Sequence, residues 1–254
     1  MANPDKILTL ATRTGKALLE SGAETYRVED TICRICRSLH MEEAESICLP
    51  TGIYVTAMMN GKSYTKIARI PERSTNLHKV DRLNQLSRDA STLDEHEFEK
   101  KLDEIINETP YSNITDLLFA GLSAFGFVLV FGGVLTDALV AFVLGILVRT
   151  LDKTLNSLQI NYLFSVAISA AVLTILALSA SFLQLVVSTD SVIIGTIMLL
   201  VPGLAITNAV RDSIAGDLIS GLARGAEALL IAVAVALGNG AGMMIWIWTG
   251  GMIG

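Results

Sequence analysis

Residues 117–136, LLFAGLSAFGFVLVFGGVLT, form a run of twenty uncharged residues. A helix of this length is about 30 Å long, enough to cross the hydrocarbon core of a bilayer. The whole chain shares this bias, because 52% of its 254 residues are hydrophobic and only 17% are charged. An ordinary soluble domain carries about 25% charged residues. The stretch therefore predicts a membrane-spanning helix, and the composition predicts further ones.

Four more apolar runs follow toward the C terminus. We expect five spans in a membrane domain over residues 113–254, at about 117–132, 134–151, 162–183, 191–210 and 227–248. The second span is long enough only if it begins near Val134, which places Asp137 inside the outer boundary of the bilayer. Trp246 and Trp248 lie where an interfacial aromatic belt is expected.

The first part of the chain is polar. Residues 1–114 carry 15 of the 19 Lys/Arg and 18 of the 25 Asp/Glu, a local net charge of 15 − 18 = −3. Apolar residues recur at helical spacing, then alternate as in a strand up to Asn60-Gly61, a hairpin signal, and helical spacing returns near Leu77. Thr92 and Glu95 predict a capping box for a last helix. We therefore expect an α+β domain over residues 1–112.

The basic residues of the second part predict an orientation. The first twenty residues contain no unbroken apolar core typical of a secretory signal, so we expect the N-terminal domain in the cytoplasm. Five spans then place the connections 149–161 and 211–224 inside, and they hold Arg149, Lys153, Arg211 and Arg224. This agrees with the positive-inside rule and puts the C terminus outside. The predicted fold is a mainly α membrane protein, with a small cytoplasmic α+β domain before a bundle of five transmembrane helices.

Pro202-Gly203 interrupts the fourth predicted span. Proline leaves the carbonyl of Met198 without its usual donor, and glycine lets the backbone turn away. Broken helices build substrate sites in secondary transporters, because their free backbone groups can face a polar ligand. The alternative is a simple kink whose backbone groups are satisfied by a neighbouring helix.

Polar side chains gather after this break. We consider Pro202 and Gly203 candidate substrate-pathway residues, together with Asn208, Arg211, Asp212, Asp217, Arg224 and Glu227. The spacing of Arg224 and Glu227 allows them to neutralise each other. Gly221 and Gly225 have the spacing of a close helix contact. The alternative is a solvated loop between two spans.

The remaining candidates have competing interpretations. Asp137 is either a helix cap or a proton-titrating site, because a partly desolvated carboxylate titrates nearer neutrality. Cys33 and Cys36 resemble half a metal site, but their helical spacing favours packing, so we expect no metal and no cofactor. The weakly acidic chain has no basic face for nucleic acid, and no nucleotide-binding loop indicates an ATP-driven pump.

Two stretches carry a family resemblance. Residues 18–40, LLESGAETYRVEDTICRICRSLH, resemble the opening of the threonine/serine exporter family, and residues 202–227, PGLAITNAVRDSIAGDLISGLARGAE, resemble its membrane signature. The chain ends after the fifth predicted span. That resembles the split form of the family, in which a separate small membrane protein supplies the second half. The resemblance implies a partner subunit in the cell membrane, which is the inner membrane in a two-membrane cell.

These observations predict a transporter subunit and not an enzyme. The chain is expected to serve a secondary, proton-coupled exporter of small polar metabolites, with threonine and serine implied by the resemblance. The split form is also associated with dicarboxylates such as succinate, so a dicarboxylate exporter subunit is an alternative. A membrane-anchored cytosolic enzyme or regulator is another, although an anchor would need neither Pro202-Gly203 nor polar groups between its spans.

Overall fold

The computed structural model describes residues 3–108 and 111–251 in two compact units. Unit 1 contains Met1–Pro110 together with Gly203–Glu227, and unit 2 contains Tyr111–Pro202 together with Ala228–Gly254. The chain therefore enters unit 1 a second time, through residues that the sequence analysis placed among the spans and their connections. A division near residue 112 into a cytoplasmic and a membrane domain stays a prediction.

Unit 1 begins with two helices joined by a tight turn. The side chain of Asn3 caps α1 (Pro4–Glu20), whose first turn contains proline, and both features favour a helix start. Gly22 has a φ of 89°, a conformation that glycine adopts without strain, and here the chain turns into α2 (Thr25–Ser38). Both helices bury the apolar stripes that the sequence predicts.

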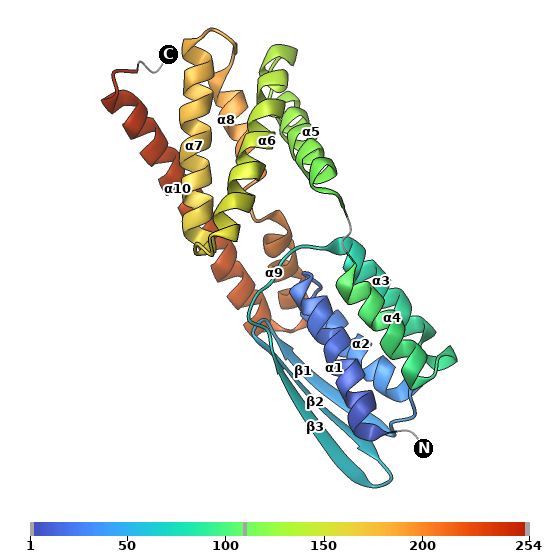
Figure 1. Cartoon of the computed structure of the whole chain (residues 1–254). Coiled ribbons are helices and arrows are strands. Elements are labelled where there is room, and N and C mark those ends of the chain that lie inside the picture. Colours follow the sequence, from blue (N-terminus) through green and yellow to red (C-terminus); the bar gives the residue numbers. More distant parts are fainter. Residues whose placement is uncertain (1–2, 109–110, 252–254) are drawn as a thin grey trace. The chain divides into compact units, whose positions relative to one another are not determined.

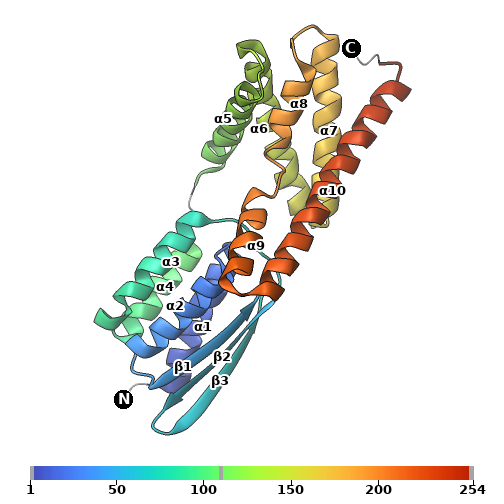
Figure 2. The same cartoon turned by 180° about the vertical axis from the view of Figure 1, so that it is seen from behind.

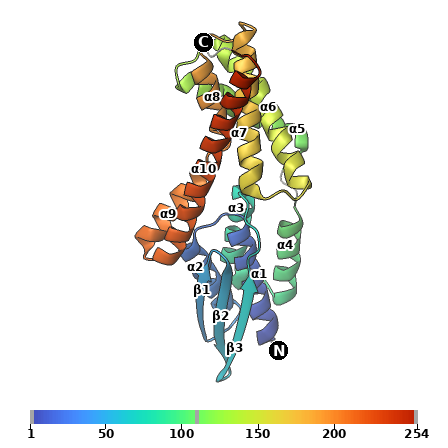
Figure 3. The same cartoon turned by 90° about the vertical axis from the view of Figure 1, so that its left-hand side faces the viewer.

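A three-stranded antiparallel sheet follows, in the order β1-β2-β3. Its strands are β1 (Glu43–Leu49), β2 (Gly52–Met59) and β3 (Lys62–Arg69). The predicted hairpin is confirmed, since Asn60 and Gly61 between β2 and β3 both have positive φ. β1 was not predicted. Helices α1 and α2 pack against one face of the sheet (Figures 1 and 3).

The first part of unit 1 ends with two further helices and a short 3-10 turn: α3 (Leu77–Asp89), η1 (Ala90–Thr92) and α4 (Glu95–Asn107). The predicted capping box is two residues out of place. Asp94 caps α4, with Glu97 as its reciprocal partner, whereas the Thr92 hydroxyl donates to the Asp89 carbonyl inside the 3-10 turn. The Thr92 hydroxyl thus bonds to the nearby backbone and does not cap α4.

Unit 2 is helical in its described part (Figure 2). It contains α5 (Asn113–Val130), α6 (Leu135–Ser157), α7 (Tyr162–Phe182), α8 (Thr189–Ile197) and the larger part of α10 (Leu218–Trp248). Glycines allow its helices to approach closely. A Cβ on Gly121 would lie 2.8 Å from the Phe142 carbonyl oxygen of α6, and one on Gly242 would lie 2.6 Å from the Ala171 carbonyl oxygen of α7. Such contacts are typical of membrane helices.

Three helices of the described residues are long and apolar enough to cross a membrane, namely α5, α7 and α10. The predicted count of five spans is therefore not confirmed. α6 has 23 residues and carries Arg149, Asp152 and Lys153 in its last turns. α10 has 31 residues and begins at Leu218, so much of the expected connection 211–224 is helical.

The fourth predicted span, 191–210, is not one helix. α8 ends at Ile197, residues 198–200 form a turn, Val201 lies in a bend, and α9 (Gly203–Ala215) begins directly after Pro202. Proline cannot donate a helical hydrogen bond, and the Leu199 and Leu200 amides instead bond three residues back. With nine residues, α8 is only about 14 Å long. The predicted break is confirmed, and the span over residues 191–210 stays a prediction.

Candidate functional site

Four of the eight predicted pathway residues contact the loop between α1 and α2 or the first residue of α2. The first amide groups of a helix need acceptors from outside the helix, and the Glu24 side chain makes no cap for α2. Asp212 of α9 supplies the acceptor instead. Its Oδ1 accepts the Thr25 N–H at 3.0 Å, and its Oδ2 accepts the Thr25 hydroxyl at 3.0 Å. A carboxylate is favourable at this position, because a helix N terminus carries a partial positive charge.

Arg224 from α10 completes this contact. Its Nη2 donates to the Ala23 carbonyl at 2.8 Å, and its Nε lies 3.1 Å from Asp212 Oδ2 at an ion-pair distance. Both charged side chains are buried, with 5% and 0% of their surfaces exposed. A buried charge pair of this kind leaves a large penalty if one member is removed.

Two neighbours extend the contact along α9. Asn208 donates its Nδ2 to the Gly22 carbonyl at 2.8 Å, and Arg211 Nη1 lies 2.6 Å from Glu24 Oε1. Burial by itself would raise the pKa of Glu24, but hydrogen bonds from its own backbone N–H and from Arg211 bring it below the ordinary value of 4.5. We call these six residues the Asp212 cluster: Glu24, Thr25, Asn208, Arg211, Asp212 and Arg224.

The other candidates near α9 lie outside the cluster. Glu227 forms an ion pair with Arg73 at 2.6 Å, whereas Arg224 pairs with Asp212, so the mutual neutralisation of Arg224 and Glu227 stays a prediction. Asp217 lies in the turn before α10, and its Oδ2 is buried with no hydrogen-bond partner among the described residues. Burial and the charge of Asp212 raise the pKa of Asp217.

The glycine predictions have different outcomes. A Cβ on Gly221 would lie 2.8 Å from the Ala209 carbonyl oxygen of α9, so the predicted close contact is confirmed there. A Cβ on Gly225 would make only ordinary contact with Ala209, at 3.9 Å. Gly203 has no atom within 4 Å of its Cβ position in the described chain and is not among the glycines with a positive φ, so neither close packing nor a left-handed backbone requires glycine there.

Asp137 lies in the first turn of α6 in unit 2 and is fully buried. Its Oδ2 accepts the Val134 N–H at 3.1 Å and the Ser188 N–H at 3.3 Å, and its Oδ1 accepts the Val187 N–H at 2.6 Å. These bonds join the start of α6 to the loop between α7 and α8. Asp137 therefore acts as a cap, and proton coupling through it stays a prediction.

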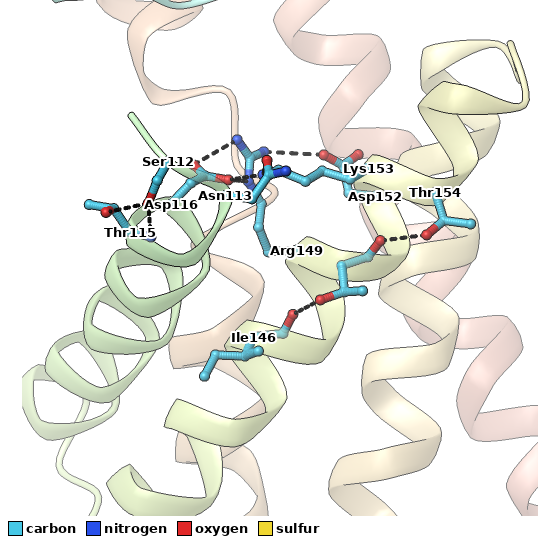
Figure 4. A network of polar contacts seen from close by, with 10 residues as sticks. Ser112, Asn113, Thr115, Asp116, Ile146, Arg149, Asp152, Lys153 and Thr154 are labelled. Atoms are coloured by element: carbon cyan, nitrogen blue, oxygen red, sulfur yellow. Dashed lines mark hydrogen bonds and ion pairs between the residues drawn. The ribbon is translucent and has the colours of Figure 1, made fainter. Parts of the chain in front are cut away.

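A second polar group lies where α5 begins and α6 ends (Figure 4). Arg149 holds Asp116 through two bonds, Nε to Oδ2 at 2.9 Å and Nη2 to Oδ1 at 3.1 Å, and its Nη1 lies 3.2 Å from Asp152 Oδ2. Lys153 Nζ is 2.8 Å from Asp116 Oδ2. From the sequence, Arg149 and Lys153 indicated only the orientation of the chain. The spacing of Arg149 and Asp152, three residues apart on one helix, could have indicated their ion pair, but Asp116 lies 33 residues from Arg149.

Packing explains the cysteines. Cys36 and Cys48 are buried in the core of unit 1, and burial raises the pKa of the Cys36 thiol to about 12. No group of three or more potential metal ligands occurs in residues 3–108 and 111–251.

Comparison with known proteins identifies the family. Residues 9–246 match the family described as "Putative threonine/serine exporter". The chain belongs to this family. The family is one of transporters, and its name denotes no enzyme. The three helices that are long and apolar enough to cross a membrane are consistent with a membrane protein.

Similar relatives include transporter subunits. The "Probable succinate transporter subunit YjjP" of Klebsiella aerogenes is 28% identical over 90% of both chains, and the Escherichia coli K12 protein of the same name is 26% identical over 94% of both. The "Probable threonine/serine exporter" of Mycobacterium tuberculosis is 26% identical over 89% of this chain but only 44% of its own length. No solved structure matches this chain significantly.

Proposed function

We propose that this chain is one subunit of a secondary exporter for small polar metabolites that carry a carboxylate. The observation that carries the proposal is the helix break between Ile197 and Gly203 in a chain of an exporter family. Backbone groups in such a break can bind a polar ligand, which a continuous helix does not allow. The break also has no evident use in a membrane anchor, which argues against an anchored enzyme or regulator.

Threonine and serine are the substrates that the family name favours, and coupling to protons, with Asp137 as the candidate residue, belongs to the proposal. A dicarboxylate is the second candidate, because the two relatives that this chain covers almost fully are named succinate transporter subunits. Those names, and the partial coverage of the mycobacterial relative, support a separate partner subunit.

We assign two structural roles to the predicted pathway residues. Pro202 and Gly203 open the backbone, and the Asp212 cluster fixes α9 to the loop before α2. Asp217 and Glu227 stay candidates for the same pathway. A charge that crosses hydrocarbon unpaired would cost several kcal/mol at least, so paired polar side chains are expected along the route.

Counterflow in vesicles tests the function. Vesicles that contain this chain and a co-expressed small membrane partner are expected to exchange labelled threonine, serine or succinate, whereas the chain alone exchanges little. A Pro202→Ala, Gly203→Ala double variant lets the helix continue and is expected to lower the flux. Gly126→Ala on α5 is the matched control, since its Cβ position is also free of atoms within 4 Å. Equal flux in both variants would remove the break from the mechanism.

The proposed orientation, with the N terminus in the cytoplasm and the C terminus outside, has its own test. Residues 1–2 and 252–254 lie outside the described residues. A cysteine introduced at Thr189 is expected to react with an impermeant reagent in sealed cells, and one at Ser157 is not. Reaction at Ser157 would contradict the orientation.

A further inference from the structure

Unit 2 contains a cavity beside the helix break that has no assigned ligand. Its volume is about 300 Å³, and it lies between α5, α6 and the turn after α8. Its lining combines charged, hydroxyl and apolar groups, including Asp116, Ser123, Arg149, Asp152, Leu199 and Leu200. Pockets for small molecules begin at about this size and combine apolar walls with a few polar groups. A larger hollow of about 530 Å³ is lined by α4 alone and has only one wall.

The charges in this pocket are arranged so that one of them can change partner. Arg149 presents two nitrogens to Asp116, the same fork that binds a free carboxylate. Asp116 has a second cation, because Lys153 Nζ lies 2.8 Å away and is also held by Asn113 Oδ1 at 3.1 Å. When Arg149 turns its fork to a ligand, Asp116 therefore keeps a partner and no charge is left alone.

Asp152 positions the guanidinium during this exchange. It contacts the third nitrogen of Arg149 at 3.2 Å, and the Ser165 hydroxyl donates to its other oxygen at 3.4 Å. The side chain of Asp152 is only 15% exposed, whereas that of Arg149 is 42% exposed and accessible to a ligand. Arg149 is thus held at one nitrogen and free to exchange at the other two.

We propose that the Arg149 pocket binds the carboxylate of the exported molecule, with Arg149 exchanging Asp116 for the ligand. This inference rests on the proposed export function. The shared chemistry of threonine, serine and succinate is the carboxylate, and Leu199 and Leu200 place the ligand beside the broken helix.

Equilibrium binding of labelled ligands to the purified full chain with its partner tests the proposal. Arg149→Lys keeps the charge but loses the fork, and it is expected to weaken binding about tenfold. Asp116→Asn removes the competitor of the ligand, and it is expected to tighten binding. Arg34→Gln on α2 is the control, because within residues 3–108 and 111–251 Arg34 forms an ion pair only with the exposed Asp30. A merely structural role would make both pocket variants bind less.

Separate arms identify the ligand. Threonine and succinate are compared with threonine amide and succinamide, which lack the carboxylate and are expected not to compete. The proposed binding site is refuted by any of three results: unchanged affinity in Arg149→Lys, weaker binding in Asp116→Asn, or full competition by the amides. If the wild-type complex still transports these molecules, the proposed export function stands. A wild-type complex that neither binds nor transports any of these carboxylates would overturn both.

Discussion

Asp212→Asn should strongly destabilise unit 1. The substitution keeps the shape of the side chain, and the remaining carbonyl oxygen can still accept the Thr25 N–H. It removes the charge that faces Arg224 at 3.1 Å, where both side chains are almost completely buried. Removing one member of a buried ion pair costs about 3–5 kcal/mol, because the other charge stays buried without compensation. For a chain of this size this corresponds to a melting temperature lower by roughly 6–20 °C.

Asp217→Asn is the matched control, five positions away and with the same chemical change. The buried oxygen of Asp217 has no hydrogen-bond partner among the described residues, and burial with the charge of Asp212 raises its pKa. Removing this charge is therefore expected to leave the melting temperature unchanged or to raise it. Thermal unfolding in detergent, followed by intrinsic fluorescence, measures both variants under one condition.

A double variant separates the ion pair from other effects. Asp212→Asn combined with Arg224→Gln removes both charges, so its destabilisation is expected to be well below the sum of the single ones. The reasoning fails if Asp212→Asn melts within about 2 °C of the wild type, if Asp217→Asn loses as much stability, or if the two single effects add fully.

Four further predictions concern Glu24, Glu29, Gly221 and Asp137. Glu24→Gln should destabilise at neutral pH, because the folded pKa of Glu24 is lowered, and this difference should shrink as pH falls below 4.5 toward that folded pKa. Glu29→Gln should stabilise at neutral pH, because burial raises the folded pKa of Glu29, and this gain in stability should disappear as pH falls to 4.5. Melting curves measured across this pH range would contradict both predictions if the two variants changed the melting temperature in the same direction at neutral pH. Gly221→Ala should destabilise by about 1–3 kcal/mol through its clash with α9, whereas Gly225→Ala should not, and equal denaturation midpoints would refute the contact. Asp137→Asn should uncouple export from a pH gradient if the residue carries the proton; if it is only a cap, the variant should unfold at lower temperature with coupling intact, and flux assays with melting curves separate the outcomes.

Local patterns predicted the parts of unit 1 whose large apolar side chains face the core. The hairpin at Asn60 is an example, because its strand alternates in step with its burial. β1 was not predicted for the opposite reason. Its inward positions hold the small residues Ala44 and Cys48, while its largest apolar side chain, Ile47, is 63% exposed. Hydrophobic alternation therefore gave no strand signal there.

The candidate site was only partly predictable, because its partners are distant in the chain. Sequence features selected Asn208, Asp212 and Arg224 as unusual polar residues in an apolar context, and the structure brings them together. Their shared partner is the loop before α2. In the hydrogen bonds that join them to this loop, the two partners are 186 to 201 residues apart in the sequence. Helical periodicity reports neighbours only three or four residues apart. The bond between Arg149 and Asp116 was missed for the same reason.

The helix break has a structural environment on each side that a simple kink would not need. Before it, Leu199 and Leu200 line a charged cavity in unit 2. After it, α9 begins at Gly203, and the Asp212 cluster fixes this helix within unit 1. Only Val201 and Pro202 separate the cavity-lining residues from the fixed helix. Proline restricts its own φ and disfavours the helical conformation for the residue before it, so the two residues between the cavity-lining leucines and α9 do not continue α8 as a helix.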